Sequence, residues 1–202
     1  MLLAIHPKNP DERKIKQVVA LLRKGAVIIY PTDTVYGMGC DILHPEAIER
    51  ICKIKNIDPQ KAQLSFLCSD LSHLSEYTKA IDTPLYRFLK QYLPGPFTFI
   101  LEASKKVPKL IKSRKDTVGI RVPDNKIAKA ILTELGNPIL STSLPLGEDE
   151  EIFSDPELIH DHFEHLVDVV IDGDIGGSIP STIVDCTKNP PEIIRMGLGE
   201  IQ

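Results

Sequence analysis

The chain has 202 residues, of which 42% are hydrophobic and 26% are charged, and its net charge is −4. This composition is ordinary for a globular protein, and the length supports one sizeable core, so we expect a single domain over residues 1–202. A pI near 5.9 argues against a protein whose whole surface binds nucleic acid. The longest apolar run, Ala26 to Tyr30, is far shorter than the roughly 18 residues that cross a bilayer, which excludes a membrane-spanning helix.

The N-terminus and the cysteines indicate a cytoplasmic protein. The chain begins with a short apolar stretch but has no basic leading region and no small-residue cleavage pattern, so we expect no secretory signal. The four cysteines are scattered and form no Cys-x-x-Cys pair. We therefore expect reduced thiols rather than a disulfide framework, and a cytoplasmic location.

The opening of the chain reads as helix, strand, loop and helix. Residues 11–24 place apolar side chains at helical spacing and are followed by Gly25, a common helix stop. Ala26 to Tyr30 is a continuous apolar run that ends at Pro31, which is typical of a strand buried on both faces. Residues 45–55 again show helical spacing, so a second helix is expected there.

Short strands and helices then alternate to the end of the chain. The expected strands are 64–68, 97–101, 117–122, 138–141, 167–171, 181–186 and 192–196, and the further expected helices are 83–92, 125–135 and 155–165. Strands interleaved with helices predict an α/β (mixed α+β) fold. We expect a twisted sheet of about seven strands, mixed in direction and covered by helices on both faces.

Three loops beside buried strands are rich in hydroxyl groups and glycines, at 31–39, 140–147 and 173–182. Ligands bind beyond strand ends in open sheets, so these loops are candidate binding segments. In the first loop, the glycines would let the backbone approach a ligand, and Thr34 would offer a neutral hydrogen bond. The same residues suit a rigid turn whose side chains bond their own backbone, and none of the loops is a Walker-type phosphate loop.

Arg121 stands within the apolar segment Val-Gly-Ile-Arg-Val, where a buried guanidinium needs an anionic partner. An internal salt bridge to Asp or Glu and a ligand carboxylate both remain open. Lys55 and Arg195 are further cations that would suit a phosphate, although each is also consistent with a surface charge. Because no GxSxG motif occurs and no cysteine has an evident histidine partner, any chemistry should proceed by positioning and charge stabilisation.

Charge is unevenly distributed along the chain. Residues 105–115 are rich in Lys and Arg and contain no acid, so they are either a solvated face or a patch that attracts phosphate. Lys109, Lys112 and Arg114 are the candidate RNA contacts of this patch. The histidines of residues 160–165 lack the paired spacing of a helical zinc site, and no metal site formed by protein side chains is identified.

Five sequence blocks, read in order, are those of a known family. They are PTDTVYGMGCD at 31–41, PGPFTFIL at 94–101, VGIRVP at 118–123, PILSTS at 138–143, and PSTIVD at 180–185 followed by IIRMG at 193–197. With these blocks the chain resembles the YrdC-like family of threonylcarbamoyl-adenylate synthases over residues 11–197. The sequence STSLPLG at 141–147, where the synthases read STSAN, is similar to the YciO-like branch. The resemblance implies the YrdC/RibB-like three-layer fold.

The resemblance implies an enzyme that forms an adenylate from L-threonine, bicarbonate and ATP with Mg²⁺ and releases pyrophosphate, for the modification of an adenosine in transfer RNA. No other cofactor is expected, and transfer RNA need not touch the chain, because a separate complex performs the transfer in the family. The alternative is a non-catalytic protein of the same fold that binds double-stranded RNA or a nucleotide. By the resemblance, threonine would be bound by Thr34, Arg121, Ser141 and Ser181. The nucleotide would be bound by Thr117, Ser143 and Arg195, and its phosphates by Lys55. The catalytic cations would be Lys55 and Arg121.

One position departs from the family pattern. The synthases carry a Lys-x-Arg pair after the second helix, and here the same place reads Lys55, Asn56 and Ile57. Isoleucine cannot pair with a phosphate, and the loss of one such contact commonly costs roughly 10²-fold in rate. The departure therefore predicts a reduced synthase activity.

Overall fold

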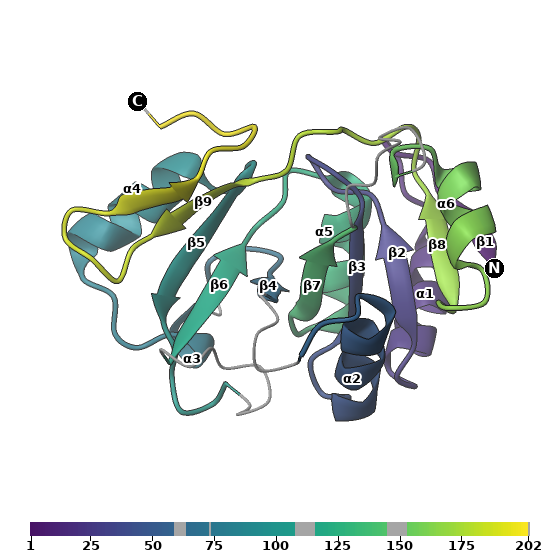
Figure 1. Cartoon of the computed structure of the whole chain (residues 1–202), viewed down its shortest axis with the longest axis horizontal. Helices are drawn as coiled ribbons and strands as arrows, with labels where there is room; N and C mark the ends of the chain where they lie inside the picture. The colour runs from purple at the N-terminus through teal and green to yellow at the C-terminus, as the bar shows by residue number, and fades with distance from the viewer. Residues whose placement is uncertain (59–63, 73, 108–115, 145–152, 202) are drawn as a thin grey trace.

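The computed structural model describes residues 1–58, 64–72, 74–107, 116–144 and 153–201 (Figure 1). The strands of this part are β1 Leu2–Ala4, β2 Val27–Tyr30, β3 Gly37–Asp41, β4 Ser65–Leu67, β5 Phe97–Glu102, β6 Thr117–Arg121, β7 Ile139–Ser143, β8 Val169–Asp172, β9 Thr182–Asp185 and β10 Glu192–Arg195. They form one sheet in the order β1-β8-β2-β3-β7-β4-β6-β5-β9-β10, with both parallel and antiparallel pairs. The mixed sheet is confirmed, but it has ten strands where the sequence predicts about seven.

Strand β3 was not predicted, because its sequence Gly-Met-Gly-Cys-Asp has little strand propensity. It forms because it pairs antiparallel with β2 on one side and β7 on the other. A Cβ atom at Gly39 would lie 2.6 Å from Ile139 Cγ2 and 2.7 Å from the Leu140 carbonyl oxygen, so this glycine serves the close approach of two strands. The prediction that residues 31–39 form one loop is therefore wrong beyond residue 36. The short strand β1 was also missed.

The helices agree with the sequence pattern to within two residues at each end. They are α1 Glu12–Leu22, α2 Pro45–Ile54, α3 Leu74–Tyr77, α4 Thr83–Tyr92, α5 Lys126–Leu135 and α6 Pro156–Phe163. Side chains cap several helix starts: Asp82 Oδ1 accepts from Leu85 N at 2.8 Å, and Asn125 Oδ1 accepts from Ile127 N at 3.0 Å. Only the four-residue helix α3, among the described helices, was not predicted.

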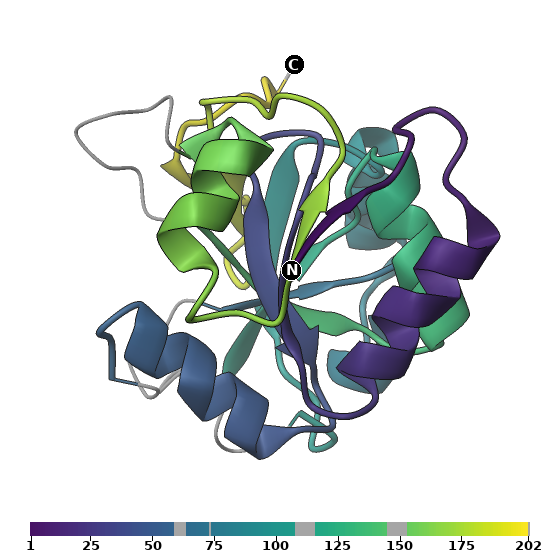
Figure 2. The same cartoon turned by 90° about the vertical axis from the view of Figure 1, so that its right-hand side faces the viewer.

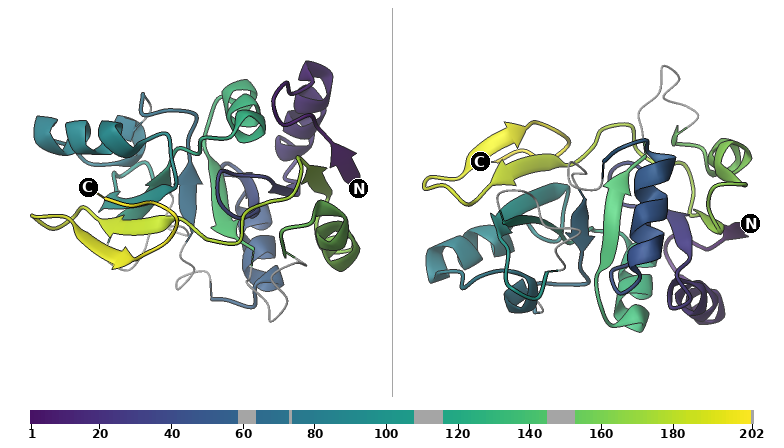
Figure 3. Two further views of the ribbon diagram at one scale, coloured as in Figure 1. Left: turned by 90° about the horizontal axis from the view of Figure 1, so that it is seen from above. Right: turned by 60° about the horizontal axis from the view of Figure 1, so that its bottom comes forward.

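Two apolar clusters lie on opposite faces of the twisted sheet, because successive residues of a strand point to opposite sides. Ile28 of β2 packs in one cluster with α1 and α5, whereas Ile29 packs in the other with α2 and α6. Figure 2 shows α1 and α5 on one side of the strands and α2 and α6 on the other. Figure 3 shows the β9–β10 hairpin and β1 at opposite ends of the molecule. The expected three-layer arrangement is confirmed.

None of the described helices is long and apolar enough to cross a membrane. The four cysteines are buried and free of disulfide bonds, in agreement with the expectation of reduced thiols. Burial raises the pKa of Cys40, Cys68 and Cys186 to about 12, so these thiols stay protonated at neutral pH.

Candidate functional site

A cavity of about 450 Å³ opens over the middle of the sheet. Its floor is hollow because the strand register places small residues side by side: Ser65 of β4 pairs with Gly119 of β6 on one side and Ser141 of β7 on the other. Towards the edge of the sheet, Ile183 of β9 pairs with Thr98 of β5 and with Arg195 of β10. A sheet surface with small side chains at its centre and larger ones around it leaves room for a small-molecule ligand.

Most of the predicted site residues meet in this cavity. Thr34 is buried next to it, and Thr117 begins β6 outside the lining. Lys109, Lys112 and Arg114, the predicted RNA contacts, lie outside the described residues. Within the described part of the basic stretch, Lys106 forms an exposed ion pair with Glu76 at 3.6 Å. The predicted residues that line the cavity are Lys55, Arg121, Ser141, Ser143, Ser181 and Arg195.

Arg121 forms an internal salt bridge, which is one of the two alternatives that its sequence context left open. Its Nη2 donates to Asp33 Oδ1 at 2.6 Å, to Thr34 Oγ1 at 2.6 Å and to Thr32 Oγ1 at 3.0 Å. The side chains of Arg121 and Asp33 are only 8% and 10% exposed. Arg121 Nε and Asp33 Oδ2 are buried and have no hydrogen-bond partner among the described residues. Arg121 is thus both fixed by the first loop and turned towards the cavity.

The three segments singled out as loops in the sequence converge beside the cavity, although residues 140–143 of the second are the end of strand β7 and not a loop. Gly177 N of the third loop donates to the Thr34 carbonyl oxygen of the first at 2.8 Å, and Leu144 N of the second donates to the Tyr36 carbonyl oxygen at 3.1 Å. A Cβ atom at Gly177 would lie 2.6 Å from that Thr34 oxygen, so a side chain there would separate the loops. The Tyr36 hydroxyl donates to the Asp174 carbonyl oxygen at 2.8 Å and joins them again. Residues 145–152 of the second loop lie outside the described residues.

The end of α2 places Lys55 and Ile57 at the cavity. Asn56 adopts a left-handed backbone with φ of 51°, while Asn56 N donates to the Lys53 carbonyl and Ile57 N to the Cys52 carbonyl, both at 3.0 Å. These two bonds are a Schellman motif, which ends the helix and turns Ile57 back against the core. Ile57 therefore lines the cavity close to Lys55, so the departure from the family pattern falls within the site.

Lys55 crosses from α2 to the end of β7. Its Nζ donates to the Ser143 carbonyl oxygen at 2.7 Å and to Thr142 Oγ1 at 3.3 Å. Burial lowers the pKa of Lys55, because the charged ammonium loses water. Arg195 Nη2 likewise donates to the Ser181 carbonyl oxygen at 2.8 Å, and burial, with the charge of Arg121, lowers the pKa of Arg195. Both cations are held by neutral acceptors. These contacts do not neutralise the two positive charges, which can therefore attract an anion.

Two hydroxyl pairs at the floor of the cavity were not foreseen. The buried Tyr30 hydroxyl donates to Ser141 Oγ at 2.6 Å, and Thr98 Oγ1 lies 2.9 Å from Ser181 Oγ. Burial raises the pKa of Tyr30 above its ordinary value, so it remains a neutral donor. This bond leaves the Ser141 hydroxyl proton free to point into the cavity. No sequence signal reveals these pairs, because only the strand register brings them together.

The lining has a clear charge preference. Among the described residues it contains Lys55, Arg121 and Arg195, several hydroxyl groups and no Asp or Glu. Asp33, behind the lining, is committed to Arg121. No group of three or more His, Cys, Asp or Glu side chains that could hold a metal ion occurs in the part of the chain that the structure describes. The arrangement suits a ligand that carries phosphate or carboxylate groups and brings any metal ion with it.

Known proteins are similar to this chain in sequence and structure. YciO of Escherichia coli, described as an uncharacterized protein, is 45% identical over 98% of this chain and 96% of its own length. The crystal structure of E. coli YciO superposes with a TM-score of 0.92 at 43% identity and covers 99% of this chain and 97% of YciO.

More distant relatives have a named activity. The threonylcarbamoyl-AMP synthase of Vibrio vulnificus is 32% identical over 91% of this chain and 98% of its own length. The crystal structure of Pyrococcus abyssi Sua5 complexed with L-threonine superposes with a TM-score of 0.86 at 26% identity, over 98% of this chain and 57% of Sua5. The family model described as telomere recombination (Sua5/YciO/YrdC) matches residues 20–197. The chain therefore belongs to the Sua5/YciO/YrdC family.

Proposed function

We propose that this chain binds ATP and L-threonine in the cavity over the sheet and forms L-threonylcarbamoyladenylate, or a related adenylate, for transfer RNA modification. The observation that carries the proposal is the lining itself, which among the described residues offers cations and hydroxyl groups and no carboxylate. Relatives with the same fold support the substrate class, since one is named a threonylcarbamoyl-AMP synthase and another is described with bound L-threonine.

The amino acid fits the inner end of the cavity. Arg121 faces the cavity from the floor, and the Asp33 carboxylate partly balances its positive charge. The guanidinium therefore suits a ligand carboxylate that binds reversibly. Ser141 and Ser181 are each held by a second hydroxyl, which orients them towards the polar groups of a bound threonine. Thr34 acts from behind, because its hydroxyl accepts from Arg121 and fixes the guanidinium.

The nucleotide phosphates fit the outer end, where Lys55 and Arg195 approach from opposite sides of the sheet centre. Threonine first condenses with bicarbonate to a carbamate and water. A carbamate oxygen then attacks the α-phosphorus of ATP, and the bond from that phosphorus to the bridging oxygen breaks, so that pyrophosphate leaves with the electron pair. The two cations stabilise the charge that develops on the phosphate oxygens, and no protein nucleophile is required.

Magnesium is expected to accompany ATP. Mg²⁺ prefers carboxylate, phosphate and water oxygens, and the described lining offers it no carboxylate. The residues present therefore do not form a Mg²⁺ site of their own, and phosphate oxygens would hold the ion. We expect the activity to be slow, because Ile57 adds an apolar side chain where a further cation would strengthen phosphate binding.

Calorimetry tests the binding part of the proposal. ATP and L-threonine are titrated into the wild type, Lys55→Met and Ser141→Ala, with Lys53→Met as the matched control because Lys53 is an exposed lysine of the same helix. We expect Lys55→Met to weaken ATP binding by about tenfold or more and Ser141→Ala to weaken threonine binding, with Lys53→Met unchanged. Equal affinities in all four proteins would place the ligands elsewhere and refute the assignment.

A further inference from the structure

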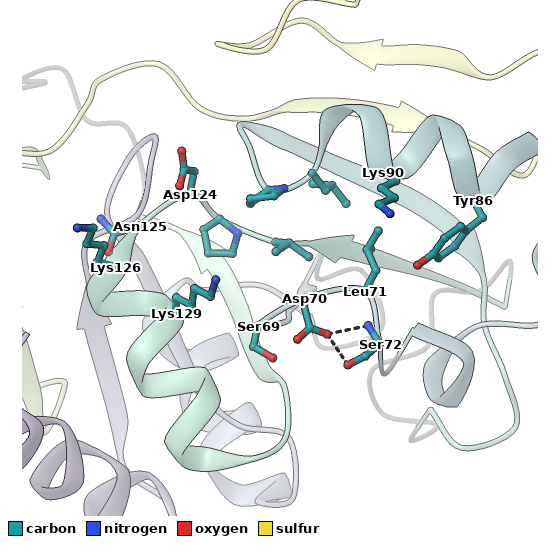
Figure 4. Close-up of a pocket in the computed structure, with 14 residues that line it drawn as sticks. Ser69, Asp70, Leu71, Ser72, Tyr86, Lys90, Asp124, Asn125, Lys126 and Lys129 are labelled. Atoms are coloured by element: carbon teal, nitrogen blue, oxygen red, sulfur yellow. Dashed lines mark hydrogen bonds between the residues drawn. The ribbon is translucent and has the colours of Figure 1, made fainter. Parts of the chain in front are cut away.

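A second cavity, of about 500 Å³, opens at the carboxyl ends of β4 and β6. It shares no lining residue with the first cavity. β4 and β6 are parallel neighbours, so their carboxyl ends lie at the same edge of the sheet. Figure 4 shows that the segments leaving these strands form the floor, while α4 and α5 stand on either side.

The chain segments that leave β4 and β6 pass to opposite faces of the sheet. β4 leads through α3 and α4 to β5, beyond β6, whereas β6 leads through α5 to β7, beyond β4. Helix α4 packs on the face of the sheet that carries Phe99, since the rings of Phe88 and Phe99 lie 5.8 Å apart. Helix α5 packs in the cluster that contains Leu67, on the opposite face. The two helices therefore flank the carboxyl ends of these strands, and the crevice outside such ends is where open α/β sheets bind ligands.

Two lysines from different helices face this cavity. Figure 4 shows the side chains of Lys90 of α4 and Lys129 of α5 directed towards the space between the helices, together with the hydroxyl of Tyr86. Neither lysine ammonium group has a hydrogen bond or an ion pair with another residue in the described ranges. Lys126, by contrast, points away and donates to the Lys8 carbonyl oxygen at 3.2 Å. The two ammonium groups are therefore available to a ligand.

The lining also contains two carboxylates, those of Asp70 and Asp124. Asp70 Oδ1 accepts from Ser72 N at 2.7 Å and from the Ser72 hydroxyl, which fixes the loop after β4. Asp124 points away from the two lysines in Figure 4. Tyr86 is 42% exposed, so its ring offers an uncovered flat surface, and Ser69 adds a hydroxyl to the floor. The volume lies within the usual range of small-molecule sites.

We propose that this cavity binds a small molecule with an anionic group, a phosphate or a carboxylate, that bridges Lys90 and Lys129. Its uncharged body lies against the Tyr86 ring, and its polar groups contact Ser69. The bridge joins two helices that pack on opposite faces of the sheet, beside the Asp70 carboxylate that Ser72 holds on the cavity floor.

Nuclear magnetic resonance tests this site apart from the first cavity, because backbone amides report each location separately. Inorganic phosphate and benzoate are the two probes, so the result also distinguishes a phosphate ligand from a carboxylate ligand. The variants are Lys90→Gln and Lys129→Gln. The matched control is Lys16→Gln, which removes an exposed lysine that pairs with Glu12 at 3.9 Å on α1.

We expect at least one probe to shift the amide signals of Ser69, Ser72 and Lys129 in a saturable manner. Each of the two variants should weaken that binding by about tenfold, and the control should leave it unchanged. A lack of saturable shifts with both probes would overturn the proposal. Shifts that persist with the same affinity in Lys90→Gln and Lys129→Gln would overturn it as well, because the lysines would then take no part.

Discussion

Replacing Asp33 by asparagine would leave the Arg121 guanidinium without the carboxylate that balances it. The two side chains are 8% and 10% exposed, and the joining atoms, Arg121 Nη2 and Asp33 Oδ1, are 2.6 Å apart. Asparagine has nearly the same shape, so the change removes a charge without opening a cavity. The hydrogen bonds from Arg121 to Thr32 and Thr34 at 3.0 and 2.6 Å would remain.

The expected cost follows from the burial of this pair. Removing one partner of a buried salt bridge costs about 3–5 kcal/mol, because the other charge stays buried and uncompensated. Two retained hydroxyl contacts favour the lower end, about 3 kcal/mol. For a domain of this size that corresponds to a fall in melting temperature of roughly 6–12 °C. The double variant Asp33→Asn/Arg121→Met removes both charges and should recover most of the loss.

Thermal unfolding with and without L-threonine measures both consequences. In Asp33→Asn no protein carboxylate balances the Arg121 charge. The carboxylate of bound threonine should therefore stabilise this variant more than the wild type. In the double variant threonine should give no stabilisation. An Asp33→Asn protein as stable as the wild type would refute the energetic role of the pair. Equal threonine-induced shifts in all three proteins would show that Arg121 does not contact the ligand.

Two further predictions concern the cations and hydroxyls of the cavity. Tyr30→Phe removes the donor to Ser141, so we expect the free energy of unfolding to fall by about 1 kcal/mol. Threonine affinity should become several-fold weaker while ATP affinity stays unchanged. Equal losses of affinity for both ligands in calorimetry would contradict this prediction. Burial lowers the pKa of Lys55, and phosphate binds its charged form, so ATP affinity should be full below that lowered pKa and should fall as the pH rises through it. Lys55→Arg, which stays charged, should remove this fall in a calorimetric pH series, and an identical profile in both proteins would exclude Lys55 as the titrating group.

The elements that the sequence predicts well are those with strong local signals. Helix α5 has a side-chain cap at Asn125 and ends at Gly136, whose φ of 81° suits glycine. Strand β2 is a run of four buried apolar residues. In each case the signal lies within a few residues along the chain, so the local pattern of residue types is sufficient to predict the element.

Strand β3 and the strand order depend on distant partners. Gly37 and Gly39 form a strand only because β2 and β7 pair with them on both sides, and β7 lies about a hundred residues further along the chain. The same holds for the site. The hydroxyls of Ser141 and Ser181 lie in recognisable sequence blocks, whereas their supports, Tyr30 and Thr98, come from strands whose register no local pattern determines.

The partner of Arg121 shows the limit of sequence reasoning most clearly. A buried arginine in an apolar strand predicts an anionic partner but does not say which one, because Asp33 is 88 residues away. Only the packing of the first loop over the end of β6 selects that carboxylate. Ile57 is the opposite case: its identity is visible in the sequence, and the structure adds that it lies in the cavity lining.

Pyrophosphate release is the measurement that tests the proposed function most directly. The wild type and Ile57→Arg are each incubated with ATP, magnesium, L-threonine and bicarbonate, and in parallel with each of these omitted. We expect release that requires all the components, slow in the wild type and roughly 10–100-fold faster in Ile57→Arg, because the new guanidinium adds a phosphate contact beside Lys55. Release that ignores threonine or bicarbonate, or no release from either protein, would contradict the synthase proposal.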